Sequence, residues 1–224
     1  MHAPRVISLD LDDTLWPVGP VIAAADAEFL AWLRARHPHV VHGHDVDSMR
    51  ALRLQVAARF PDQSHDMTFV RRQALADQFA SAGYAEHAGI DEALEVFFLG
   101  RNRVQFYDDV RPALLRLRMK YRLFAVSNGN ADLKRCGIDD LFDGHVTAAA
   151  AGAAKPDARI FAHLLREARV EPIEVLHIGD DPLADVVGAT QAGMQTAWRN
   201  REARAWPSHY APPVRVITSL AEIL

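Results

Sequence analysis

Short apolar runs that end at polar residues alternate with amphipathic stretches over the second half of the chain. Short runs bounded by turn signals are typical of buried strands, whereas apolar residues spaced three and four apart indicate helices that bury one face. The repeated strand and helix order predicts an α/β fold, with a doubly wound parallel sheet covered by helices on both faces. From residue 112 onward we expect a helix at 112–120, a strand at 122–127, a helix near 131–136, a strand near 144–148, a helix at 157–169, a strand at 174–178, a helix at 182–192, a strand at 194–198 and a final edge strand at 214–217.

Residues 17–106 have the helical spacing alone. Apolar residues recur three and four positions apart in four stretches, and such stripes can pack against one another as a four-helix bundle. We therefore expect an all-helical domain at 17–106, inserted into an α/β domain formed by 1–16 and 107–224. The stripes are Ile22, Ala25, Phe29 and Leu33, then Met49, Leu52 and Val56, then Leu75, Phe79 and Ala82, then Ile90, Leu94, Phe97 and Phe98.

The composition narrows the classes of partner. With 25 basic and 29 acidic residues the net charge is −4, so no overall positive field attracts nucleic acid or an anionic membrane. The sequence has neither a leader pattern nor an apolar run near the ~18 residues of a membrane span, and we expect a cytoplasmic monomer or homodimer. Cys136 is the single cysteine, which excludes an intrachain disulfide and a cysteine-based zinc site.

The first apolar run, which begins at Val6, ends in two carboxylates two positions apart, Asp10 and Asp12, followed by the hydroxyl of Thr14. Residues i and i+2 of a strand point to one face, so the two carboxylates point the same way if strand geometry persists. Two carboxylates about 4 Å apart repel by roughly 4 kcal/mol at an effective dielectric constant near 20, and a divalent cation offsets that cost. Oxygen ligands of this kind suit Mg²⁺. The alternative is an acidic turn in which Asp12 or Asp13 caps a helix.

Polar residues also stand at three later points of the strand and helix pattern. Ser127 and Asn128 end one strand and offer neutral donors to a phosphate oxygen, Lys155 precedes a helix start, and Asp180 and Asp185 follow another strand. In open α/β sheets, ligands bind at the carboxyl edge of the strands. We therefore expect these side chains to converge with the first acid pair on one site.

Asp181 has two interpretations. It directly precedes Pro182 at the start of a predicted helix, where aspartate commonly accepts hydrogen bonds as the N-cap and proline takes the first helical position. These signals favour an N-cap, and ligation of a metal by Asp181 stays open as the alternative.

The four clusters, in this order, resemble the motifs of the haloacid dehalogenase superfamily, whose members are mostly Mg²⁺-dependent phosphatases. The resemblance covers essentially the whole chain and implies a Rossmann-like core with a helical cap domain at the insert. The runs Asp12–Trp16, Ser127–Asn130 and His177–Asp181 further resemble a bacterial branch that dephosphorylates flavin mononucleotide and intermediates of the riboflavin pathway, such as 5-amino-6-(5-phospho-D-ribitylamino)uracil.

The resemblance implies a phosphoric monoester hydrolase with Mg²⁺ as its cofactor and a small-molecule phosphate ester as its substrate. Asp10 and Asp180 are the implied direct metal ligands, together with the main-chain carbonyl of Asp12, and Asp185 is a further or water-mediated ligand. We expect Asp10 to attack phosphorus and form an aspartyl-phosphate, and Asp12 to act as general acid and then as the base that activates water.

The remaining core residues are expected to bind the phosphate group. Lys155 and the hydroxyl of Ser127 would stabilise charge on the transferring group, with Asn128 beside them, because such catalysis depends mostly on positioning and electrostatics. Thr14 would orient the acid and base Asp12. The structural alternatives are a surface lysine at Lys155 and a turn former at Thr14.

Other functions and the source of specificity stay open. The alternatives are a phosphomutase, a generic sugar-phosphate or phosphoglycolate phosphatase, a haloacid dehalogenase and a non-catalytic phospho-acceptor domain; Asp12 and Asp180 argue against a dehalogenase, which needs neither a second acid nor a metal. Within the insert, His65, Phe69 and Arg71 are the candidate specificity residues, and a solvated helix start is the alternative for them.

Overall fold

The computed structural model describes residues 3–84 and 89–223, which fold into two compact units. The core unit contains the chain up to Pro17, Gln105–Gly129 and the chain from Gly137 onward. The helical unit contains Val18–Val104 and the short segment Asn130–Cys136. The chain therefore passes from one unit to the other four times.

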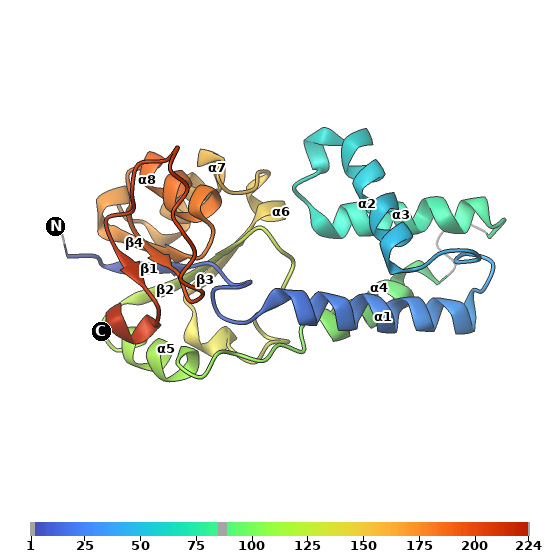
Figure 1. The fold of residues 1–224 in the computed structure, drawn as a ribbon, viewed down its shortest axis with the longest axis horizontal. Helices are drawn as coiled ribbons and strands as arrows, with labels where there is room; N and C mark the ends of the chain where they lie inside the picture. The colour runs from blue at the N-terminus through green and yellow to red at the C-terminus, as the bar shows by residue number, and fades with distance from the viewer. Residues whose placement is uncertain (1–2, 85–88, 224) are drawn as a thin grey trace. The chain divides into compact units, whose positions relative to one another are not determined.

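The core unit is built on a six-stranded parallel sheet in the order β3-β2-β1-β4-β5-β6 (Figure 1). The central strand β1 pairs with β2 on one side and with β4 on the other, so the carboxyl ends of β1 and β4 flank the point where the strand order reverses. The predicted doubly wound α/β core is confirmed. The strands are β1 (Val6–Leu9), β2 (Arg122–Ser127), β3 (Gly144–Thr147), β4 (Val175–Gly179), β5 (Gln195–Arg199) and β6 (Val216–Ile217).

Helices cover both faces of this sheet, with α5 on one side and α7 and α8 on the other (Figure 1). Every residue of β1 and β4 is buried, as expected for central strands of a parallel sheet. One apolar cluster joins Phe124 and Val146 of the strands to Ile160, Phe161 and Leu164 of α7. The helices are α5 (Val110–Arg118), α6 (Ala148–Ala151), α7 (Ala158–Ala168) and α8 (Gly188–Gln191).

The helical unit contains α1 (Val18–Arg36), α2 (Val46–Arg59), α3 (Met67–Ser81) and α4 (Ile90–Arg101). Helix α3 begins at Met67 because the carboxylate of Asp66 accepts hydrogen bonds from two backbone N–H groups of its first turn. The predicted apolar stripes meet in one cluster around Phe29 and Phe97, except that Val56 packs in a second, smaller cluster.

The helix expected near 131–136 is wrong, because this segment forms only one hydrogen-bonded turn. The carboxylate of Asp132 accepts from the N–H groups two and three residues later, and Gly137, with a φ of +71°, ends the turn. The segment belongs to the helical unit: Asp132 N donates to Asn102 Oδ1 (2.7 Å), and Arg135 forms two hydrogen bonds with Glu95 (2.9 and 3.0 Å).

The helix predicted at 182–192 is present, with π geometry over Pro182–Val187 that continues directly into α8. The edge strand is shorter than expected and keeps only Val216–Ile217 of the predicted 214–217. Among the described residues, no helix has the length and apolar character needed to cross a membrane.

Candidate active site

The acid pair after β1 lies in a turn rather than on a strand. β1 ends one residue before Asp10, whose N–H donates to Ile178 O of β4 (2.9 Å). The chain then turns at Asp13, which has a φ of +57° and donates its N–H to Trp16 O (2.7 Å). The strand geometry that was expected to align Asp10 with Asp12 therefore does not persist to Asp12.

The orientation of Asp12 is set by a tryptophan. Its carboxylate accepts a hydrogen bond from the indole N–H of Trp16 (2.8 Å), and the Trp16 ring is fully buried and packs edge-on against Phe106. A rigid buried ring that donates a hydrogen bond to the carboxyl group limits the rotation of that group.

Three carboxylates converge where the carboxyl ends of β1 and β4 meet. One oxygen from each of Asp10, Asp180 and Asp185 lies within 4.8 Å of the other two. Asp10 follows β1, Asp180 follows β4, and Asp185 lies in the π turn after β4. The structure thus brings together the residues that the sequence predicts as side-chain metal ligands.

The π turn places Asp185. Asp181 is its N-cap, accepting from Leu183 N (2.8 Å) and Ala184 N (2.7 Å), as the helix-start signals favoured. The carbonyl of Asp181 accepts from both Asp185 N (3.0 Å) and Val186 N (3.3 Å), which widens the turn by one residue. The Asp185 carboxylate then accepts from Asp181 N (2.9 Å).

Gly179 gives the Asp185 side chain the room to lie there. A Cβ atom at Gly179 would stand 2.1 Å from Asp185 Cγ, far inside van der Waals contact. The glycine at the end of β4 is therefore required by the close approach of a carboxylate to the backbone.

Lys155 bridges two of the carboxylates. Its buried ammonium group donates to Asp10 Oδ1 (2.6 Å), Asp185 Oδ1 (2.7 Å) and Val126 O (2.8 Å), which uses all three of its protons. The backbone of Lys155 is held by Asn128, which accepts from Lys155 N (2.7 Å) and donates to Lys155 O (3.0 Å). The side-chain amide of Asn128 therefore positions the backbone of Lys155.

The site contains more acidic than basic side chains, with three carboxylates around the ammonium group of Lys155. Burial raises the pKa of Asp10 despite the neighbouring ammonium, and burial together with Asp185 raises the pKa of Asp180 to about 6. Burial would also raise the pKa of Asp185, but Lys155 and His177 hold it below its usual range. The two carboxylates outweigh burial at Lys155 and raise its pKa, so it stays charged.

Two predicted hydroxyl groups have partners within the site. Thr14 Oγ1 lies 3.1 Å from Asp10 Oδ2 and 3.2 Å from Asp180 Oδ1, so these two acids share its one proton. The expected partner of Thr14 was Asp12. The hydroxyl of Ser127 is buried at the end of β2 and accepts from Gly129 N (3.0 Å).

His177 is part of the site, although the sequence analysis assigned it no role. Its ring nitrogens lie 2.8 Å from Ser8 Oγ and 3.2 Å from Asp185 Oδ1, and burial lowers its pKa, which favours the neutral imidazole. The sequence did contain a signal for this role, because His177 is a titratable residue inside an otherwise apolar strand and such residues are buried only when they have hydrogen-bond partners.

The donor set fits a hard divalent cation. Three convergent carboxylates offer oxygen ligands alone, which is what Mg²⁺ and similar ions bind. The buried ammonium of Lys155 faces two of the three carboxylates, Asp10 and Asp185, so the cluster keeps more acidic than basic groups and can accept a cation.

Comparison with known proteins identifies the family. The model of the haloacid dehalogenase-like hydrolases matches residues 4–193. The chain belongs to this family. It is 29% identical to the 5-amino-6-(5-phospho-D-ribitylamino)uracil phosphatase YigB of Escherichia coli, over 97% of this chain and 95% of the relative. The phosphatases among its relatives bear out the prediction of a phosphoric monoester hydrolase.

Solved structures agree on the fold of this haloacid dehalogenase-like hydrolase. A 2-haloacid dehalogenase from Pseudomonas syringae pv. tomato has a TM-score of 0.92 and 34% identity, with 98% of this chain and 96% of that chain covered. A phosphatase of the same superfamily from Thermococcus onnurineus has a TM-score of 0.68 and 26% identity, with 98% and 95% covered.

Arg71, a predicted specificity residue, has partners inside the helical unit. Its guanidinium donates to Asp26 Oδ1 (2.8 Å) and lies 3.3 Å from the ring centre of Phe97, and the residue is only 7% exposed. Burial and the neighbouring Arg53 lower its pKa to about 10. These contacts place Arg71 in the interior of the bundle.

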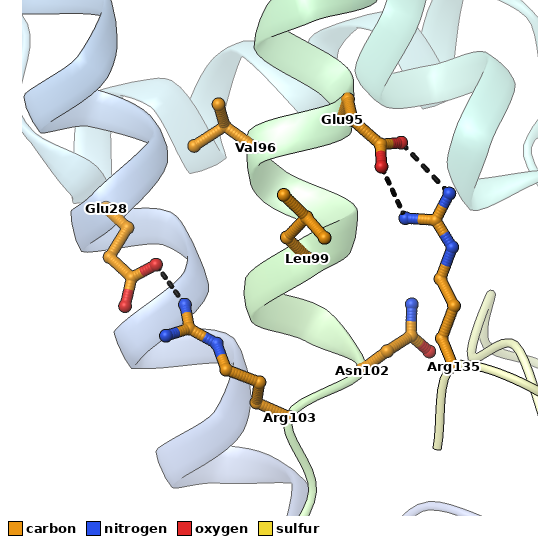
Figure 2. Close-up of a pocket in the computed structure, with 7 residues that line it drawn as sticks. All are labelled: Glu28, Glu95, Val96, Leu99, Asn102, Arg103 and Arg135. Carbon is orange, nitrogen blue, oxygen red and sulfur yellow. Dashed lines mark hydrogen bonds and ion pairs between the residues drawn. The ribbon is translucent and has the colours of Figure 1, made fainter. Parts of the chain in front are cut away.

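The other two specificity candidates lie elsewhere in the helical unit. Phe69 packs edge-on against Phe60, and His65 is half-buried before α3. The helical unit also carries an open cavity of about 620 Å³ between two ion pairs, with Leu99 exposed between them (Figure 2). None of the three predicted residues lines it; its lining is Glu28, Glu95, Val96, Leu99, Asn102, Arg103 and Arg135.

Proposed function

We propose that this protein is a Mg²⁺-dependent phosphatase that hydrolyses a small-molecule phosphate monoester through an aspartyl-phosphate intermediate. The observation that carries the proposal is the convergence of Asp10, Asp180 and Asp185 around the ammonium group of Lys155. This set holds a nucleophilic carboxylate, oxygen ligands for a cation and a fixed positive charge within one hydrogen-bonded cluster. Phosphoryl transfer requires these parts, because its catalysis is mostly positioning and charge stabilisation.

Asp10 is the nucleophile in this proposal. Lys155 donates to its Oδ1, and the Thr14 hydroxyl lies within hydrogen-bond distance of its Oδ2, so the buried carboxylate is held in place. A carboxylate oxygen forms a bond to phosphorus as the ester oxygen leaves, and the leaving oxygen takes a proton from Asp12. In the second step Asp12 accepts a proton from water, which attacks phosphorus and releases Asp10 and inorganic phosphate.

The metal-holding residues in this proposal are Asp10, Asp180 and Asp185, together with the main-chain carbonyl of Asp12. When bound, Mg²⁺ supplies positive charge to the phosphate oxygens. The remaining work belongs to the chain itself. The ammonium of Lys155 stays charged and adjacent to the nucleophile, and His177 contacts the same Asp185 oxygen, Oδ1, that accepts from Lys155.

The substrate we propose is a phosphate of the riboflavin pathway or flavin mononucleotide. The support is the similarity to a 5-amino-6-(5-phospho-D-ribitylamino)uracil phosphatase over nearly the full length of both chains. Arg71 does not add to this support, because its guanidinium is engaged by Asp26 and Phe97 within the helical unit.

Haloacid dehalogenation is the second candidate, because the 2-haloacid dehalogenase structure matches this chain with a TM-score of 0.92. Displacement of halide from carbon needs an attacking carboxylate but no cation on a phosphate. The acidic cluster formed with Asp180 and Asp185 therefore favours the phosphatase.

The test is a substrate panel with the purified protein, in which released phosphate and released chloride are both measured. We expect phosphate release that requires Mg²⁺, with 5-amino-6-(5-phospho-D-ribitylamino)uracil or flavin mononucleotide ahead of sugar phosphates and phosphoglycolate. Asp10→Asn should fold and be inactive. Chloride release from 2-chloropropionate without phosphate release would favour the dehalogenase, isomer formation would favour a mutase, and a tenfold lead for sugar phosphates or phosphoglycolate would overturn the substrate proposal alone.

A further inference from the structure

Asp180 is held from outside the carboxylate cluster by an arginine on a distant loop. The guanidinium Nη2 of Arg204 donates to the main-chain carbonyl of Asp180 (2.8 Å) and to its carboxylate Oδ2 (3.1 Å). Thr14 lies 3.2 Å from the other carboxylate oxygen, Oδ1. Thr14 has one proton to share between Asp180 and Asp10, so Arg204 is the charged donor that restricts rotation of the Asp180 carboxylate about its last side-chain bond.

Hydrogen bonds within the loop hold the backbone of Arg204 in place. Asn200, which is buried, accepts from Arg204 N (2.9 Å) and donates to Arg204 O (2.8 Å), closing a short ring of main chain. Ala203 inside that ring adopts a φ of +52°, in the left-handed region that residues with a Cβ atom rarely occupy. Two hydrogen bonds and one unfavourable backbone conformation thus fix the base of the Arg204 side chain.

A second side chain from the same segment supports the same carbonyl. Trp198, at the end of β5, donates its indole N–H to Asp180 O (2.8 Å) and packs edge-on against Trp206 with ring centres 5.0 Å apart. The segment from Trp198 to Trp206 therefore fixes both the backbone and the carboxylate of Asp180.

The neighbouring arginines are directed elsewhere. A cavity of about 150 Å³ in the core unit is lined by Arg199, Arg201 and Arg204, among others. Arg199 and Arg201 both pair with Asp109, and the Arg201 guanidinium lies 4.0 Å from the ring centre of Tyr107. Arg204 therefore pairs with Asp180, whereas the neighbouring Arg201 pairs with Asp109.

We propose that Arg204 is a positioning residue for the divalent-metal site, acting by orienting the carboxylate of Asp180. This inference rests on the proposed function, in which Asp180 is a metal ligand. Side chains that hold a metal ligand in place by a hydrogen bond typically contribute ten- to a hundredfold to metal affinity. The Arg204 side chain is 45% exposed, so solvent screens its repulsion of a nearby cation, and the orienting effect dominates.

The test compares Mg²⁺ binding by isothermal titration calorimetry in the parent protein and in variants, without substrate. Arg204→Met should bind Mg²⁺ at least tenfold more weakly, and Arg204→Lys, which keeps the charge but not the guanidinium, should fall between the two. Arg201→Met is the matched control and should bind within about twofold of the parent. Activity assays should show the half-saturating Mg²⁺ concentration rising in Arg204→Met while kcat at saturating Mg²⁺ stays within about threefold.

The outcomes separate this inference from the proposed function. Mg²⁺ binding by the parent that Asp180→Asn abolishes, together with unchanged or tighter binding by Arg204→Met, overturns the role of Arg204 and leaves the phosphatase proposal standing. A parent protein that does not bind Mg²⁺ overturns both. If Arg204→Met does not fold by circular dichroism, Arg204→Lys decides: binding equal to that of the parent overturns the inference, and weaker binding supports it.

Discussion

Replacing Lys155 by methionine removes a buried ammonium group while keeping most of the side-chain volume. The group lies 2.6 Å from Asp10 Oδ1 and 2.7 Å from Asp185 Oδ1. At an effective dielectric constant near 20, each contact corresponds to about 6 kcal/mol of attraction, most of which offsets the desolvation of the three groups. Losing one partner of a buried pair leaves uncompensated charge, so we expect Lys155→Met to lower the free energy of unfolding by about 3–5 kcal/mol at pH 7.

The sign of the pH dependence follows from the carboxyl groups left behind. Without Lys155, the folded-state pKa of Asp10, which burial already raises, increases further and that of Asp185 increases from its lowered value, so the variant loses stability relative to the parent as pH rises. The deficit should be smaller at pH 5 than at pH 8. Added Mg²⁺ should recover part of it, because the cation replaces the missing charge.

Urea denaturation followed by tryptophan fluorescence measures this effect, since Trp16 and Trp198 are buried in the core unit. Lys120→Met is the control, because Lys120 is exposed in the turn after α5 and should tolerate the same replacement. A loss of less than about 1 kcal/mol at pH 7 in Lys155→Met, or a loss that does not change with pH, would refute the reasoning.

Three further predictions concern the acids and the helical unit. Asp12→Asn should slow esters with poor leaving groups more than an activated aryl phosphate, measured as kcat/KM, because the proton donor matters most for a basic leaving oxygen; equal losses would contradict the assignment. Because the pKa of Asp180 is raised to about 6, Mg²⁺ must displace a proton below that pH, so calorimetric affinity should fall about fivefold between pH 6 and pH 5, and a flat profile would argue against ligation by Asp180. Arg71→Ala should lower the free energy of unfolding by about 3–5 kcal/mol by leaving Asp26 short of a partner, whereas Arg72→Ala, which breaks an exposed pair, should cost under about 1 kcal/mol; similar losses would contradict the interior role.

The convergence of the core acids could be predicted from the sequence because it depends only on topology. Asp10 and Asp180 each follow an apolar run, and in a parallel sheet the carboxyl ends of the strands meet at one edge. Lys155 was placed at the same edge by its position before a helix. The apolar stripes of the helical unit could be predicted equally well, since they depend on periodicity alone.

The hydrogen-bond partners could not be predicted, because they depend on side-chain geometry that periodicity does not contain. Thr14 contacts Asp10 and Asp180 rather than Asp12, and Asn128 is engaged by the backbone of Lys155. Arg71 was a candidate specificity residue, with a solvated helix start as the alternative, and its burial follows from an acidic partner 45 positions earlier in the chain.

The wrong helix near 131–136 has a local cause. Asp132 turns its carboxylate onto the next backbone N–H groups, which competes with helix propagation, and the segment takes its partners from α4. The pattern of one sequence reports the helix propensity of the segment itself and contains no information on contacts with Asn102 and Glu95. The roles of the individual site residues remain predictions that the variants above test.

The four passages of the chain between the units limit how this molecule can be recombined. A domain exchange that treats the helical unit as one insertion at Val18–Val104 would remove the partners of Asp132 and Arg135 while leaving the Asn130–Cys136 segment behind. That segment begins two residues after Asn128, which holds the backbone of Lys155. A chimaera that keeps the active site intact therefore has to transplant both segments together, and natural exchange of this unit between relatives requires the same four junctions to change in concert.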